Sequence, residues 1–290
     1  MSIDVVIEGV GLWSPTLPGW QASQDFLAGK AEPVVAAGAR PAAALLAPGE
    51  RRRAPDSVLF ALEVAQQATE MAAREGRTLR GVFASDHGDL AINDYLCTTL
   101  MQAPDQLSPT KFHNSVHNAP AGYWAIASGS MAATTALTAG DCTFAAGLFE
   151  AALLARSEDA PVLFVAYDLP ASGPLADVVS CRTPFAVALV LSPRRERGGA
   201  ALRLALQTSP PVASLGHPWP SGHSDSYASH LGSSPALAPE PALLHAVHGD
   251  NPVARSLPLL AALARREGQT LALQAGPRLY LELEISPWLN

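Results

Sequence analysis

Cysteine is scarce in this chain. Only three, Cys97, Cys142 and Cys181, occur among its 290 residues. They are too few and too scattered for a disulfide framework or a cysteine-based zinc site. This usage suits a reducing compartment, and we expect the cytoplasm. The N-terminus lacks the basic region and apolar stretch of a signal peptide, and no run of about 18 apolar residues predicts a membrane-spanning helix.

Positive charge is also in short supply. The formal net charge is −7, which argues against a nucleic-acid partner, because contact with phosphates needs a basic surface. The sequence contains no Gly-x-x-x-x-Gly-Lys and no dinucleotide-binding fingerprint, and no Gly-x-Ser-x-Gly elbow. These absences argue against nucleotide-binding enzymes and serine hydrolases, and we expect no cofactor.

Apolar residues, in contrast, are plentiful. They make up 48% of the sequence, enough for a large buried core. Strands that alternate with helices predict an α/β fold. The predicted strands are Val5–Gly11, Val82–Ser85, Val162–Tyr167 and Phe185–Leu191, and the predicted helices are Asp56–Gly76 and Ile92–Gln102.

The C-terminal third has a different composition. Residues 209–258 hold nine of the 25 prolines and five of the eight histidines, which predicts a long surface loop. The histidines are irregularly spaced and have no cysteine beside them, so we expect no metal site. Asn251-Pro252 then predicts a helix start, followed by a helix to Gly268 and a hairpin of Thr270–Gln274 with Leu279–Ile285. We therefore divide the chain into residues 1–205, 206–250 and 251–290.

The most informative segment is 112–151, which is rich in small residues. Its predicted elements are a helix (Ala119–Ser128), a strand (Ala132–Ala139), a sharp turn (Gly140-Asp141) and a second helix (Cys142–Ala155). We expect Asp141 to cap the second helix.

This strand, turn and helix resemble the nucleophile elbow of the β-ketoacyl synthase family, with Thr138-Ala139-Gly140 where the family has Thr-Ala-Cys. The resemblance extends over roughly residues 1–205, through VVIEGVGLWSPTLPGWQASQDFLAGK, PVLFVAYDLP and PFAVALVLSP in the family's order. The phrase SVHNAPAGYW (Ser115–Trp124) resembles shortened synthase-like proteins of aryl-polyene or xanthomonadin pigment clusters, which are similar to chain length factors. The resemblance implies a thiolase-like fold, layered αβαβα, with a reduced C-terminal half.

Two departures from the family bear on catalysis. The nucleophile is missing, and Ala139 or Gly140 stands at the vacated position. Active synthases also carry two histidines that stabilise the enolate formed on decarboxylation, yet the chain has no His-Gly-Thr. The resemblance therefore implies a non-catalytic subunit that forms a heterodimer with a catalytic ketosynthase and shapes its acyl tunnel. Acyl carrier protein would be reached through that partner, because the acidic chain offers no obvious basic docking face.

The residues expected to shape the pocket or the subunit interface lie in or beside the two small-residue helices. They are Ser115, His117, Asn118, Trp124, Gly129, Ala133 and Phe144. Ser115, His117 and Asn118 have a local loop-capping role as the alternative.

Two other functions are alternatives to a non-catalytic subunit. A divergent synthase or acyltransferase would use Cys142, activated by a helix N-terminus, with His117 as base. Because Cys142 lies two residues beyond Gly140, its side chain would point away from the pocket, and we favour a packing thiol. A scaffold that only recruits other biosynthetic proteins is the second alternative.

Two charged runs allow both a functional and a plain interpretation. Asp86-His87-Gly88-Asp89 has the residues of an acid/base or metal cluster, but Asp and Gly are also the residues of a turn, which we favour. Arg51-Arg52-Arg53 could bind a phosphate or an acidic carrier. We favour a solvated run, which is the commoner fate of exposed charges.

Overall fold

The computed structural model describes residues 2–32, 38, 40–208 and 250–289. Within these residues, eight strands form one sheet in the order β3-β2-β4-β5-β1-β6-β8-β7. The strands are β1 (Ser2–Trp13), β2 (Arg80–Ala84), β3 (Thr134–Leu137), β4 (Val162–Asp168), β5 (Phe185–Ser192), β6 (Ala200–Gln207), β7 (Gln269–Gly276) and β8 (Leu279–Ile285).

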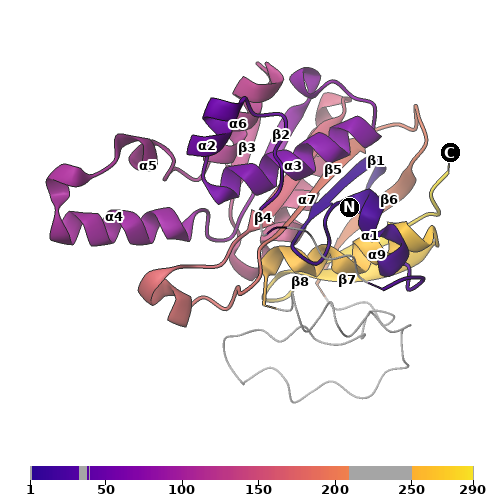
Figure 1. Cartoon of the computed structure of the whole chain (residues 1–290). Helices are drawn as coiled ribbons and strands as arrows, with labels where there is room; N and C mark the ends of the chain where they lie inside the picture. The colour runs from indigo at the N-terminus through magenta and orange to yellow at the C-terminus, as the bar shows by residue number, and fades with distance from the viewer. Residues whose placement is uncertain (1, 33–37, 39, 209–249, 290) are drawn as a thin grey trace, which may run out of the picture.

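Helices cover both faces of this sheet (Figure 1). The α-helices are α1 (Trp20–Leu27), α2 (Pro48–Arg53), α3 (Asp56–Met71), α4 (Leu90–Gln102), α5 (Pro109–His113), α6 (Ala119–Ser128), α7 (Thr143–Glu158) and α9 (Leu257–Arg265). Short 3-10 helices are η1 (Gly76–Thr78), η2 (Pro104–Gln106), η3 (Gly140–Cys142), η4 (Gly173–Asp177) and η6 (Pro252–Ser256).

The sheet is parallel at one end and antiparallel at the other. β3, β2 and β4 run parallel to one another, and the remaining neighbours are antiparallel. Every residue of β4 and β5 is buried, as expected for strands covered on both faces. Because parallel strands end at the same edge of a sheet, the residues that follow β2, β3 and β4 gather there.

Two separate packing layers lie on the two faces of the sheet. Helices α3 and α6 pack on one face, and α1, α7 and α9 pack on the other. Helix α3 approaches β1 so closely that a Cβ at Gly9 or Gly11 would lie 2.0 or 1.9 Å from a carbonyl oxygen of α3. Glycine is therefore required at both positions, because no side chain fits between strand and helix.

Most predicted elements are present with small shifts of their ends. The predicted α/β fold is confirmed, and helix α6 has the predicted bounds. The C-terminal helix and hairpin are present as α9, β7 and β8. The hairpin joins the main sheet through β6, and within the described residues no second sheet completes an αβαβα layering. Strand β6 itself was missed, because its alternation of Leu202, Leu204 and Leu206 is diluted by alanine.

Helices α4 and α5 form an arm that extends away from the body of the protein (Figure 1). Of the 13 residues of α4, only Ile92 is buried. The arm is closed on itself by Tyr95, whose hydroxyl accepts from the backbone N–H of Ser108 (3.1 Å) and whose ring lies 3.6 Å from the ammonium of Lys111. The arm thus holds its shape with few contacts to the sheet. None of the helices in the described ranges is long and apolar enough to cross a membrane.

Candidate functional site

The predicted elbow is present at the end of β3. The chain turns at Gly140, which has a φ of 57°, a left-handed conformation that glycine adopts without strain. The hydroxyl of Thr143 accepts from the backbone N–H of Ala139 (2.9 Å) and donates to the carbonyl of Gly140 (2.7 Å). Thr143 therefore fixes the turn. The prediction that Asp141 caps the helix is wrong, because the side chain of Asp141 instead pairs with Arg255 (3.4 Å).

The elbow presents no activated nucleophile. Ala139 and Gly140 are exposed at the turn and carry no reactive side chain. Cys142 is half-buried, and desolvation raises the pKa of its thiol. Arg255 lowers that pKa, while Asp141 and Asp86 raise it. The net shift of the thiol pKa is upward, which is opposite to the lowered pKa of an activated cysteine.

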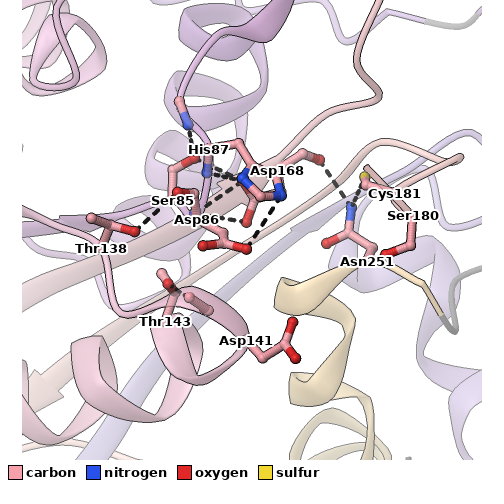
Figure 2. Close-up of polar contacts among 12 residues, drawn as sticks. Ser85, Asp86, His87, Thr138, Asp141, Thr143, Asp168, Ser180, Cys181 and Asn251 are labelled. Carbon is pink, nitrogen blue, oxygen red and sulfur yellow. Dashed lines mark hydrogen bonds and ion pairs between the residues drawn. The ribbon is translucent and has the colours of Figure 1, made fainter. Parts of the chain in front are cut away.

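A buried carboxylate organises the loop beside the elbow. Asp168, at the end of β4, is fully buried and accepts from the hydroxyl of Ser85 (2.8 Å) and from the backbone N–H groups of Asp86 (3.0 Å) and His87 (3.2 Å). Figure 2 shows these three residues converging on Asp168. Desolvation raises the pKa of Asp168 to about 7, although the hydrogen bonds from Asp86, Ser85 and His87 oppose that rise. The predicted turn at 86–89 is present, and its form depends on Asp168.

The same loop is tied to the elbow. The hydroxyl of Thr138 donates to the carbonyl of Asp86 (2.9 Å), so the last residue before the turn is held by the loop after β2. Desolvation raises the pKa of Asp86, while His87 lowers it and Asp141 raises it. The carboxylates of Asp86 and Asp141 therefore lie close enough to repel each other. Among the described residues, no group of three or more His, Cys, Asp or Glu side chains is arranged to hold a metal ion.

The C-terminal segment meets this site through Asn251. Its side-chain amide donates to the carbonyls of Asp168 (3.0 Å) and Thr183 (2.9 Å) and lies 3.2 Å from the sulfur of Cys181. Its side-chain oxygen accepts from the N–H of Val253 (2.9 Å), which confirms the predicted cap at the start of η6. Asn251 thereby joins η6 to the ends of β4 and to the loop before β5 (Figure 2).

Comparison with known proteins decides the family. The model of the β-ketoacyl synthase N-terminal domain matches residues 19–238, more than half of the chain. The chain belongs to the β-ketoacyl synthase family. A search of curated protein sequences found no match.

Solved structures of synthase complexes share this fold. One is described as a ketosynthase (ApeO) in complex with its chain length factor (ApeC) from Xenorhabdus doucetiae, with a TM-score of 0.66, 20% identity and coverage of 97% of this chain and 99% of that one. Another is the ishigamide ketosynthase/chain length factor, with a TM-score of 0.67, 13% identity and coverage of 98% and 99%. At such identities the likeness shows the fold alone.

The three loop residues predicted at the pocket or interface, Ser115, His117 and Asn118, make different contacts. The Nε2 atom of His117 lies 3.0 Å from the carbonyl of Ser85, so His117 anchors the loop after β2. The hydroxyl of Ser115 donates to the carbonyl of Phe112 (2.8 Å), which is the local capping role. Asn118 precedes α6, is exposed and makes no side-chain cap.

Two residues predicted at the pocket or interface are instead internal. Trp124 is buried under α3 and packs so tightly that a Cβ at Gly76 would lie 2.7 Å from its ring. Phe144 is buried against Phe164, with ring centroids 5.6 Å apart. Both aromatic rings fill the core, where a large side chain buries most apolar area. Both side chains are buried in the isolated chain, and their part in shaping a pocket or an interface stays a prediction. Gly129 and Ala133 are exposed, as predicted.

An open hollow lies between α2, α5 and α6. Its volume is about 470 Å³, within the range of small-molecule sites. Its lining is made of Glu50, Arg53, Thr110, His113, Val116, Asn118, Ala119, Gly122, Tyr123 and Ile126. The sequence singled out Arg53 and Asn118 among these residues but did not predict the hollow, because its walls come from separate helices that only the tertiary fold brings together.

The side of the protein that bears α6 and β3 carries uncovered apolar side chains. Phe112, Val116, Ile126 and Met131 are all exposed, and Ile126 has 75% of its surface free. Strand β3 is the edge of the sheet, pairs only with β2 among the described residues, and has two exposed threonines. We call Phe112, Val116, Ile126, Met131 and the free edge of β3 the α6 face.

Proposed function

We propose that this chain is a non-catalytic, chain-length-factor-like subunit. It pairs with a catalytic ketosynthase in the synthesis of a polyketide or a fatty-acid-like pigment such as an aryl polyene. The α6 face is the observation that carries the proposal. Apolar side chains so exposed, beside an unpaired sheet edge, are the signature of an interface with another protein.

The elbow supports a silent role in the pair. A condensing subunit needs a nucleophile that is activated at neutral pH, and Ala139 and Gly140 offer none. Cys142 is the nearest thiol, and its pKa is raised rather than lowered. His117 is held against Ser85 and so serves poorly as its base. The partner subunit would supply the catalytic residues, in a reducing cytoplasm, and would receive the acyl carrier protein.

The hollow supports a role in chain length. Ala119, Gly122, Val116 and Ile126 give it apolar walls, and it shares Val116 and Ile126 with the α6 face. In the proposed heterodimer the hollow would lie beside the partner and receive the far end of the growing acyl chain. Its capacity would then limit the length of the product.

Co-purification tests the pairing. A tagged chain expressed in its own host should bring down a β-ketoacyl synthase in a one-to-one ratio, identified by mass spectrometry. Ile126→Asp should abolish that pairing, because a buried charge without a partner opposes association. Leu153→Asp is the matched control, since Leu153 is exposed on α7, on the opposite face of the sheet, and should leave the pairing intact.

Product length gives the second measurement on the same complex. A Cβ at Gly122 has open space around it, so Gly122→Leu should narrow the hollow without unfolding α6 and should shorten the main product. Unchanged product length together with intact pairing would leave only a scaffold role. An acyl adduct mapped to Cys142 of the isolated chain, after incubation with acyl carrier thioesters, would contradict the proposal and indicate a divergent synthase.

A further inference from the structure

A buried arginine from the C-terminal segment reaches the elbow. Arg255 lies in η6, and only 12% of its side chain is exposed. Its guanidinium lies 3.4 Å from the carboxylate of Asp141, whose own side chain is 57% exposed. The Nε atom of Arg255 is buried and has no hydrogen-bond partner among the described residues. The side chain of Arg255 is therefore largely buried beside η3, and Asp141 lies between it and the solvent.

The helix that carries Arg255 is firmly seated. Asn251 fixes its start to the carbonyls of Asp168 and Thr183, and Pro252, Val253, Ala254 and Ser256 are buried. Helix η6 contacts both η3 and α7, which are the two elements of the elbow after the turn. Figure 2 shows Asp141 pointing toward the tan ribbon of η6. The ion pair between Arg255 and Asp141 is thus the polar link between η6 and the exposed end of the elbow.

Cys142 lies beside this link. Its thiol is half-buried, and the charges that act on it are Arg255, Asp141 and Asp86. We infer that Arg255 and Asp141 form a latch that holds η6 against the elbow and shields Cys142 from reagents that approach from solvent. The latch concerns the isolated chain and does not depend on the proposed pairing.

Shielding and electrostatics predict opposite effects when Arg255 is replaced. The positive charge of Arg255 lowers the pKa of Cys142, so its loss by itself would reduce the thiolate fraction and slow alkylation. Release of the latch would expose the sulfur and speed alkylation. Arg255→Met is the informative variant, because methionine keeps most of the buried apolar stem and removes only the charged head.

The measurement is the alkylation rate of each cysteine by iodoacetamide in the folded chain, followed by peptide mass spectrometry. Cys97 is exposed and Cys181 is buried, so the chain carries a fast and a slow internal reference. In Arg255→Met, the alkylation rate at Cys142 relative to that at Cys97 should rise roughly tenfold. A tenfold rise corresponds to a loss of about 1.4 kcal/mol in the free energy that favours the closed position of η6. In Arg255→Lys, which keeps the charge, the rise should be smaller.

The control is Arg265→Ala on α9, which removes an arginine paired with Glu267 (3.7 Å) and should leave Cys142 unchanged. Cys181 must stay unreactive in every variant, because that shows an intact fold. A slower or unchanged Cys142 in Arg255→Met would overturn the latch and leave Arg255 as an electrostatic neighbour. If Arg255→Met also exposes Cys181, the test rests on Asp141→Asn, which removes the other half of the ion pair at an exposed side chain, and an unchanged rate at Cys142 there overturns the latch.

Discussion

Helices α3 and α4 are both predominantly apolar, but α3 is packed against the sheet, whereas α4 contacts mainly the short elements η4, η2 and α5. Of its 16 residues, ten are buried against the sheet and α6, and a glycine pair in β1 lets its backbone approach the strand. Helix α4 has 13 residues and buries one. Leu100 and Met101, at its outer end, are exposed. Apolar residues that a chain does not bury itself are commonly buried by a partner, and the arm adjoins the α6 face in sequence through α5.

Substitutions in the core and in the arm should differ most in their effect on the free energy of unfolding of the isolated chain. Phe60 of α3 is 1% exposed and meets Trp13 edge-on, with centroids 4.7 Å apart. Phe60→Ala should therefore lower the free energy of unfolding by about 3–5 kcal/mol. Met101→Ala, at a residue 87% exposed, should change it by less than about 0.5 kcal/mol. Urea unfolding measures both, and a large loss in Met101→Ala would mean that the arm packs on its own chain.

The junction between core and arm should respond to pH. Asp168 holds the loop that leads from β2 to α4, and its pKa is raised from the usual 3.8 to about 7 by desolvation. The folded state then binds a proton more tightly than the unfolded chain, so Asp168 contributes stability at low pH that is lost as the pH rises toward 7. The free energy of unfolding should fall by at most about 1.4 kcal/mol per pH unit from this group.

Asp168→Asn isolates that contribution. The amide keeps the shape of the carboxyl group but does not titrate, so the difference in unfolding free energy between wild type and variant should shrink as the pH rises. Urea unfolding from about pH 5 to about pH 8 measures that difference. A difference that stays constant, or grows, over that interval would show that Asp168 titrates outside it and that its hydrogen bonds outweigh its burial.

The elbow could be predicted because its signal is local. A strand, a glycine turn and a small-residue helix follow one another without a break between Thr134 and Glu158, and β3, η3 and α7 have that order. The error at Asp141 was not local. Helix α7 begins after Cys142 without a side-chain cap, and the carboxylate of Asp141 is paired with Arg255 from a distant segment. Sequence position alone does not show that an arginine more than one hundred residues away will pair with Asp141.

The polar partners of the elbow could not be predicted, because they come from distant segments. Asp168 lies 83 residues from Ser85 in the chain, and Asn251 lies 83 residues from Asp168. The sequence pattern marked Asn251 only as a helix cap, although its amide also joins two strand ends. The burial of Trp124 and Phe144 could not be predicted for a related reason. Small residues are distributed around all faces of helices α6 and α7, so the sequence pattern did not show which face of each helix packs against the core. The five histidines of residues 209–249 lie outside the described residues.

A smaller and more local effect than at Phe60 is expected at the base of the arm. Asp89 accepts from the backbone N–H of Ile92 (2.9 Å) and from the hydroxyl of Ser57 (2.7 Å), and so caps α4 while tying it to α3. Asp89→Ala should weaken α4 by about 0.5–2 kcal/mol. Hydrogen exchange should show faster exchange along α4, whereas the amides of α3 keep the protection set by global unfolding.

Ser108→Ala is the matched control for that experiment. Ser108 caps the short helix α5 through the N–H of Lys111, at a longer distance of 3.3 Å, so its loss should speed exchange in α5 and leave α4 unchanged. If Asp89→Ala speeds exchange in α3 as much as in α4, then the two helices unfold as one unit. The arm would then unfold cooperatively with the core. Its exposed apolar residues would no longer indicate a partner protein.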